Sequence, residues 1–182
     1  MRTALDVHPD AFVDPDARIY PSVRGTRISI GARTRLEAFA VIRAVGGSGD
    51  VTIGEDCYIN QHCVLFSGNG IRIGNRVLLA PGVKVMPANH SVANSSGPTE
   101  RRGFMSSRGG VVIEDDVWIG ANAVLLDGTF LARGSVVGAG SVINARTTEL
   151  STWAGVPARH VKDRPTNEAD GEGGGDPPGH SA

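Results

Sequence analysis

A branched aliphatic residue recurs at every sixth position in the second half of the chain. The run consists of Ile113, Ile119, Leu125, Leu131, Val137 and Ile143. Four residues after each aliphatic comes a small or modest side chain, for example Val117, Ala123 or Ser135. A period of six fits neither the 3.6-residue turn of an α-helix nor the alternation of an ordinary strand. It predicts short strands joined by turns, in which the aliphatic points inward and the small residue fills the corner.

The same six-residue spacing continues toward the N-terminus, where the aliphatic residues fall into sets of three. These sets are Ile30, Leu36 and Ile42, then Ile53, Ile59 and Leu65, then Ile73, Leu79 and Val85, after a ragged start at Val13 and Ile19. Three units would close one triangular coil of about 18 residues, and each coil of such a solenoid is stabilised by its neighbours. We expect positive φ just after the aliphatic, where Gly120, Gly138 and Asn144 stand. Cys57 and Cys63 fall at inward small positions, which favours buried hydrophobes over nucleophiles.

Three insertions interrupt the regular pattern, and each follows the third aliphatic of a set. They come after Ile42, Leu65 and Val85, and the longest occupies residues 86–112. If the sets are coils, all three insertions leave the same corner of the prism. The longest contains the stretch PANHSVANSSGPTERRGF, which carries His90.

Composition favours one soluble domain over residues 1–164. The chain has 182 residues with 40% hydrophobic and 5% aromatic content, so its core must be mainly aliphatic. The net charge is −1, too weak for a nucleic-acid partner. No apolar stretch approaches the roughly 18 residues of a membrane span, and no secretory segment is evident. We therefore expect a cytoplasmic protein. Residues 165–182, rich in Gly, Pro and acids, are expected to be a disordered tail.

Four motifs occur in order along the chain. The segment IGEDCYINQHCVLFSGNGIRIGNRVLLAPGVKVMPANH ends at His90, and VWIGAN, GAGSV and AGVPAR follow it. Together they resemble the hexapeptide-repeat acyltransferases, and in particular the galactoside and maltose O-acetyltransferases and the shorter sugar and polysaccharide O-acetyltransferases. The resemblance implies an all-β, left-handed parallel β-helix. It also implies acetyl transfer from acetyl-CoA to a hydroxyl of a sugar or glycoside, in a homotrimer.

The resemblance also implies roles for individual residues. They are His90 as the catalytic residue, Asn60 and the neighbouring Tyr58 as acceptor contacts, Ala121 and Ala139 as backbone lining for the pantetheine arm, Trp118 beside the cofactor groove, and Arg159 and Lys162 near the phosphates of CoA. A neutral imidazole such as His90 can remove the proton from a hydroxyl as it attacks a thioester. Glu100, Arg101 and Arg102 either contact the acceptor or only solvate the loop, and the second is favoured.

Two other functions remain open, and a third is disfavoured. The γ-class carbonic anhydrases share the implied fold, but they bind a metal through three histidines. Here the repeats and insertions contain only His62 and His90, and His62 should point into solvent, so no metal is expected. The sequence also leaves open N-acetylation of an amino sugar, and a non-catalytic β-helical assembly protein.

Overall fold

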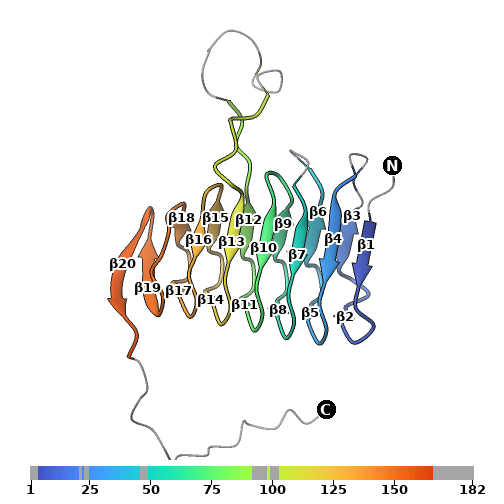
Figure 1. The fold of residues 1–182 in the computed structure, drawn as a ribbon, viewed down its shortest axis with the longest axis horizontal. Coiled ribbons are helices and arrows are strands. Elements are labelled where there is room, and N and C mark those ends of the chain that lie inside the picture. The colour runs from blue at the N-terminus through green and yellow to red at the C-terminus, as the bar shows by residue number, and fades with distance from the viewer. Residues whose placement is uncertain are drawn as a thin grey trace, which may run out of the picture.

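The computed structural model describes residues 4–20, 22, 25–45, 49–91, 98 and 103–165. These residues form the left-handed parallel β-helix that the resemblance implies, built from six coils and a C-terminal hairpin (Figure 1). No helix in this described part of the chain is long and apolar enough to cross a membrane. The predicted tail lies outside the described residues from position 166 onward.

Each coil contributes one strand to each of three sheets. Sheet A consists of β1 (Ala4–Val7), β4 (Arg27–Ile30), β7 (Val51–Ile53), β10 (Ile71–Ile73), β13 (Val111–Ile113) and β16 (Phe130–Leu131). Sheet B consists of β2 (Phe12–Val13), β5 (Arg35–Leu36), β8 (Tyr58–Ile59), β11 (Leu78–Leu79), β14 (Trp118–Ile119), β17 (Val136–Val137), β19 (Ser151–Gly155) and β20 (Ala158–Asp163). Sheet C consists of β3 (Arg18–Tyr20), β6 (Val41–Arg43), β9 (Val64–Phe66), β12 (Lys84–Met86), β15 (Val124–Leu126) and β18 (Val142–Ile143). All neighbours pair in parallel except β19 and β20.

The predicted aliphatic positions form three columns inside the prism. In sheet A, Ile53, Ile73 and Ile113 pair in register and are at most 3% exposed. The columns through Ile59 and Leu65 are built in the same way in sheets B and C. Strands of two or three residues have little stability alone, so the fold depends on burial between coils. The six-residue pattern therefore predicted both the architecture and the core.

The two cysteines belong to this core, as predicted. Both side chains are fully buried, and each thiol donates to a carbonyl of the next coil, Cys57 to Gly74 and Cys63 to Ala80. Burial raises the pKa of both thiols, that of Cys63 to about 11. Because the thiolate is the reactive form, these cysteines are unreactive near neutral pH.

The prediction about positive φ is wrong in its position. Positive φ falls on the third residue after the aliphatic, where Arg33, Asp56, Arg76 and Asp116 have φ between 55° and 61°. The glycine directly after the aliphatic serves a different purpose, namely close approach of the coils. A Cβ on Gly31 would lie 2.6 Å from the carbonyl carbon and oxygen of the next coil.

Charge alternates along the corner between sheets A and B. The guanidinium Nε of Arg33 donates to Asp56, and that of Arg76 donates to Asp116, each at 2.6 Å. Hydrogen bonds from Arg76 and Arg133 help to hold the pKa of Asp116 below its ordinary value. Opposite charges on successive coils thus bridge the turns that carry positive φ.

The three insertions leave a single corner, as predicted. They connect β6 to β7, β9 to β10 and β12 to β13, all at the corner between sheets C and A. In Figure 1 the described part of the longest one, residues 87–91 and 103–110, leaves the coils on the side away from sheet B. It runs from residue 87 to 110, and Glu100, Arg101 and Arg102 lie outside the described residues.

Candidate functional site

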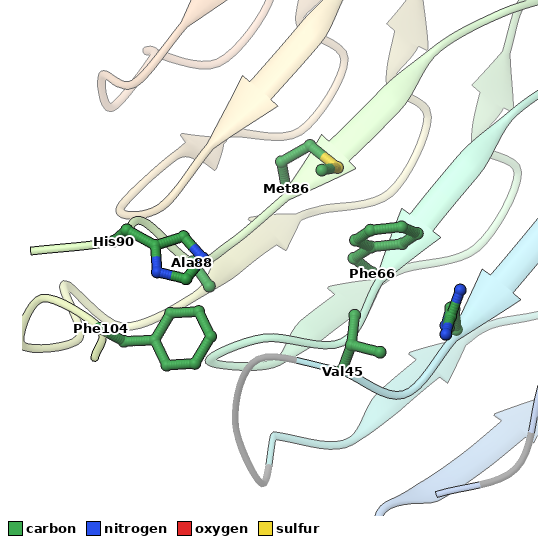
Figure 2. Close-up of a pocket in the computed structure, with 7 residues that line it drawn as sticks. Val45, Phe66, Met86, Ala88, His90 and Phe104 are labelled. Carbon is green, nitrogen blue, oxygen red and sulfur yellow. The ribbon is translucent and has the colours of Figure 1, made fainter. Parts of the chain in front are cut away.

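His90 lies where the long loop is pinched at its base. The backbone N–H of Met105 donates to the carbonyl of Asn89 at 2.8 Å, and that of Ser91 donates to Gly103 at 3.1 Å. Between these bonds His90 faces Phe104 across an antiparallel bridge, with ring centroids 4.6 Å apart. This short ladder fixes the histidine at the point where the loop leaves the coils (Figure 2).

The imidazole of His90 borders a cavity of about 390 Å³. The lining residues are Arg43, Val45, Phe66, Met86, Ala88, His90 and Phe104. The His90 side chain is exposed, and no other described residue hydrogen-bonds the imidazole, so the ring has hydrogen-bonding capacity left for a bound molecule. The arrangement allows a substrate in the cavity to lose a proton to the ring.

Sequence reasoning missed the rest of this cavity. Arg43, Phe66 and Met86 occupy the same outward position on β6, β9 and β12, with Arg43 paired to Phe66. The residue type at an outward position normally does not indicate what the side chain contacts, because such positions face water. The available signal was the apolar character of Phe66 and Met86 at that position in two successive coils, just before two of the insertions.

Asn60 lies in the turn after β8, at the corner between sheets B and C. Its side-chain amide donates to the carbonyl of Leu79 at 2.8 Å, and its backbone N–H donates to the same oxygen. Asn60 directly follows the aliphatic Ile59, and its φ is not positive, so it also departs from the turn conformation expected at that position. The side-chain oxygen of Asn60 has no hydrogen-bond donor among the described residues.

Tyr58 and Trp118 lie on the outer face of sheet B. They are 47% and 51% exposed and flank Leu78 in register on adjacent coils. The guanidinium of Arg35 lies 5.9 Å from the ring of Tyr58. Two large aromatic side chains are thus presented together on one flat face.

Ala121 and Ala139 lie one above the other at the corner between sheets B and C. The carbonyl of Ala121 accepts the N–H of Gly140 at 2.8 Å, which ties the two turns together. Their own backbone N–H groups have no acceptor among the described residues. This corner therefore presents two backbone donors that a ligand could use.

Arg159 and Lys162 lie on β20, the edge strand of the terminal hairpin. Both side chains are exposed, and no carboxylate of the described residues pairs with either one. Both cations can therefore contact an anionic ligand.

One protomer does not bring all these residues together. Asn60, Ala121 and Ala139 share one corner, while His90 stands at the other edge of sheet C. Tyr58 and Trp118 belong to β8 and β14 of sheet B, and Figure 1 shows these strands on the side away from the corner where the long loop leaves the coils. The described residues include no group of three or more His, Cys, Asp or Glu side chains placed to hold a metal ion.

Residues 110–145 match the family described as bacterial transferase hexapeptide (six repeats). The chain is 31% identical, over 145 residues, to a putative lipopolysaccharide biosynthesis O-acetyl transferase, WbbJ, of Escherichia coli. That alignment covers 76% of this chain and 69% of the relative. A galactoside O-acetyltransferase of Lactococcus lactis is 32% identical over 124 residues, covering 68% of this chain but 57% of the relative.

A solved structure shares the fold. It is AntD, an N-acyltransferase from Bacillus cereus, in complex with dTDP and 3-hydroxybutyryl-CoA. The TM-score is 0.74 at 23% identity, and the superposition covers 90% of this chain and 84% of AntD. At that identity the likeness extends to the fold alone.

Proposed function

Because the chain belongs to the hexapeptide-repeat bacterial transferases, we propose that it transfers an acetyl group from acetyl-CoA to a hydroxyl of a sugar or glycoside. Two relatives that match more than two thirds of this chain are named as O-acetyltransferases, which supports a hydroxyl acceptor, whereas a relative 44% identical over 52 residues is named as an N-acetyltransferase. The observation that carries the proposal is the position of His90, held at the loop base beside the cavity.

In the proposed reaction His90 acts as general base. The imidazole takes the hydroxyl proton as the acceptor oxygen attacks the thioester carbonyl, and the thiolate of CoA departs with a proton returned from the imidazolium. General-base assistance of this kind contributes on the order of 10²–10⁴-fold. The contact with Phe104 orients the ring, since no described side chain hydrogen-bonds it.

The donor is proposed to lie along the corner between sheets B and C. The backbone N–H groups of Ala121 and Ala139, which have no acceptor among the described residues, would bind the amide oxygens of the pantetheine arm. Trp118 would pack against that arm, and Arg159 and Lys162, which pair with no described carboxylate, would bind the phosphates.

A complete site is then proposed to form between protomers of a homotrimer. His90 and the residues of sheet B lie on different sides of one prism, so a neighbouring copy would supply the second group. Rotational symmetry repeats the same contact three times and closes the assembly. Asn60 and Tyr58 would then reach the acceptor held beside the partner's copy of the loop.

A mixing experiment tests this arrangement. His90→Ala and Trp118→Ala proteins, each impaired alone, are unfolded, combined at equal amounts and refolded. Sites shared between protomers would recover about one quarter of wild-type turnover, because one site in four would have both residues intact. No recovery above the sum of the separate variants would place the site within one chain.

The activity itself is tested with an acceptor screen. The protein is incubated with acetyl-CoA and a panel of sugars, glycosides and amino sugars, and free CoA is followed. Mass spectrometry then locates the new bond, and hydroxylamine cleaves an ester but leaves an amide. Amide products alone would favour N-acetylation of amino sugars, and no turnover with any acceptor would favour the non-catalytic alternative.

A further inference from the structure

The turn after β15 contains a buried carboxylate. Asp127 is 3% exposed, and among the described residues that are buried it is the only one with an acidic or basic side chain. A carboxylate is costly to bury unless hydrogen bonds replace the water that it loses. The hydrogen-bond partners of Asp127 therefore show what this side chain holds in place.

Both oxygens of Asp127 accept backbone N–H groups from residues 103–110, the returning arm of the long insertion. Oδ1 accepts the N–H of Gly110 at 2.9 Å, and Oδ2 accepts that of Arg108 at 2.8 Å. The next residue, Gly128, adds a third bond, because its N–H donates to the carbonyl of Gly110 at 2.8 Å. Hydrogen bonds to an ionised acceptor are stronger than those between neutral groups. The carboxylate thus clamps the returning arm to the coil that follows the insertion.

The coil itself does not require a carboxylate at this position. Asp127 stands two residues after Leu125, the third inward aliphatic of its set. Four other coils have an uncharged residue at the equivalent position, namely Ala44, Ser67, Pro87 and Ala145. The corner between sheets C and A can therefore be closed without a charge. A carboxylate that is costly to bury must then serve something outside its own coil.

The clamp lies close in sequence to the ladder that holds His90. Within the described part of the chain, Asp127 accepts the only hydrogen bond between residues 106–109 and the coils. Directly before this stretch, the N–H of Met105 donates to Asn89 in the short ladder around His90. The ladder is therefore attached to the coils on one side through β12 and on the other side through Asp127.

We propose that Asp127 is a positioning residue for the acetyl transfer, which acts through the loop and does not touch the reacting atoms. Its carboxylate fixes the arm that carries Phe104, and Phe104 restrains His90 through the backbone bridge and the ring contact. A displacement of about 1 Å in a reacting group can lower turnover on the order of 10²-fold. The effect on turnover rests on the proposed function, whereas the clamp itself can be measured without any reaction.

Two substitutions remove the clamp in different ways. Asp127→Ala removes both acceptors at a position where two other coils already carry alanine. Asp127→Asn keeps the size of the side chain but replaces one acceptor oxygen with an N–H donor. Ser135→Ala is the matched control, because Ser135 is also fully buried and hydrogen-bonded, but at the corner between sheets A and B.

Hydrogen exchange of single backbone amides, followed by NMR in the full-length protein, measures the clamp directly. In both Asp127 variants the amides of Ser91 and Met105 should exchange at least about 10-fold faster than in the wild type, because the ladder loses one of its two attachments. In Ser135→Ala these two amides should exchange as in the wild type. The ladder amides thus separate the clamp from a general loss of stability.

Turnover with acetyl-CoA and an active acceptor measures the positioning. In both Asp127 variants kcat should fall about 10- to 100-fold, because His90 is held less well. The KM for acetyl-CoA should stay within about threefold, since Asp127 is not among the residues proposed to bind the donor. Ser135→Ala should keep both constants close to those of the wild type.

Three results would overturn the inference. One is unchanged exchange at Ser91 and Met105 in both Asp127 variants, and another is exchange that rises by the same factor in every coil. The third is a kcat equal to that of Ser135→Ala although the ladder amides exchange faster, because the clamp would then have no part in turnover. Faster exchange of the ladder in a protein that acetylates no acceptor would support the clamp and refute the proposed function, so the two can fail separately.

Discussion

The rings of His90 and Phe104 lie 4.6 Å apart, and the same two residues face each other across an antiparallel backbone bridge. The backbone pairing and the ring contact therefore restrain one another. A histidine on an irregular loop obtains in this way a defined position relative to the rigid coils, which proton transfer demands.

Replacing His90 by Ala should lower kcat at least about 10²-fold, because the acceptor hydroxyl loses its base. Acetyl-CoA affinity, measured by calorimetry, should stay within about threefold, since His90 is not among the residues proposed to bind the donor. His62→Ala is the matched control. His62 is also exposed and stacks on a phenylalanine, Phe39, at 5.2 Å, but it lies at another corner. Turnover by His90→Ala close to that of His62→Ala would refute the mechanism.

Phe104→Ala should lower kcat by about 10-fold, because an aromatic contact of this kind contributes about 0.5–1.5 kcal/mol to the position of its partner. Phe104→Tyr should restore most of the lost turnover, which a general structural defect would not allow. The pH profile of kcat should keep its shape in both variants, since the base itself is unchanged. An altered profile would contradict a positioning role.

Leu65→Ala should reduce the free energy of unfolding by about 2–5 kcal/mol, because it opens a cavity in a fully buried column. The matched control is Leu5→Ala in the first coil, where the side chain is 53% exposed and the loss should stay below about 1 kcal/mol. Denaturant unfolding followed by circular dichroism measures both. Equal losses would mean that the columns do not carry the stability.

Substitutions at two glycines distinguish the cost of a steric clash from the cost of a positive φ. Gly31→Ala should destabilise by about 1–3 kcal/mol, because the new methyl group meets the backbone of the next coil. Gly140→Ala has open space around its Cβ but a φ of 67°, so it should cost about 1 kcal/mol. Thermal unfolding of both variants gives the comparison, and a larger loss for Gly140→Ala would reverse the assignment.

The buried thiol of Cys63 predicts a stability loss at alkaline pH. Its pKa is about 11 in the fold, against about 9.0 when exposed. The raised pKa means that its contribution is fully present below pH 9 and is lost as the pH rises toward 11. The stability difference between wild type and Cys63→Ala, measured by urea unfolding, should therefore shift by about 1–3 kcal/mol across this range. A difference independent of pH would contradict the burial.

The repeat made the scaffold predictable, because each inward position reports burial directly. Ile59 and Leu65 could be placed in the core from spacing alone, and the shared corner of the insertions followed from their position after the third aliphatic. The turn conformation could not be predicted in the same way. Arg33 and Asp56 adopt positive φ, and they are bridged by a charge pair between coils that are 23 residues apart in sequence.

The candidate site was only partly predictable. The motif pointed to His90, but its partner Phe104 lies beyond an irregular segment without periodicity. Phe66 and Arg43 join the cavity because coil stacking aligns them, and no local pattern marks that alignment. The roles of the candidate residues and the division into a domain of 1–164 and a tail of 165–182 stay predictions.

The register of the coils is the same whether or not a long excursion intervenes. Ile53 pairs with Ile73 across a short connection, and Ile73 pairs with Ile113 across a long one. The length of the connection therefore does not change the register of the stacked coils. Evolution, or an engineer, can rewrite the excursion and exchange one substrate preference for another while the framework stays as it is.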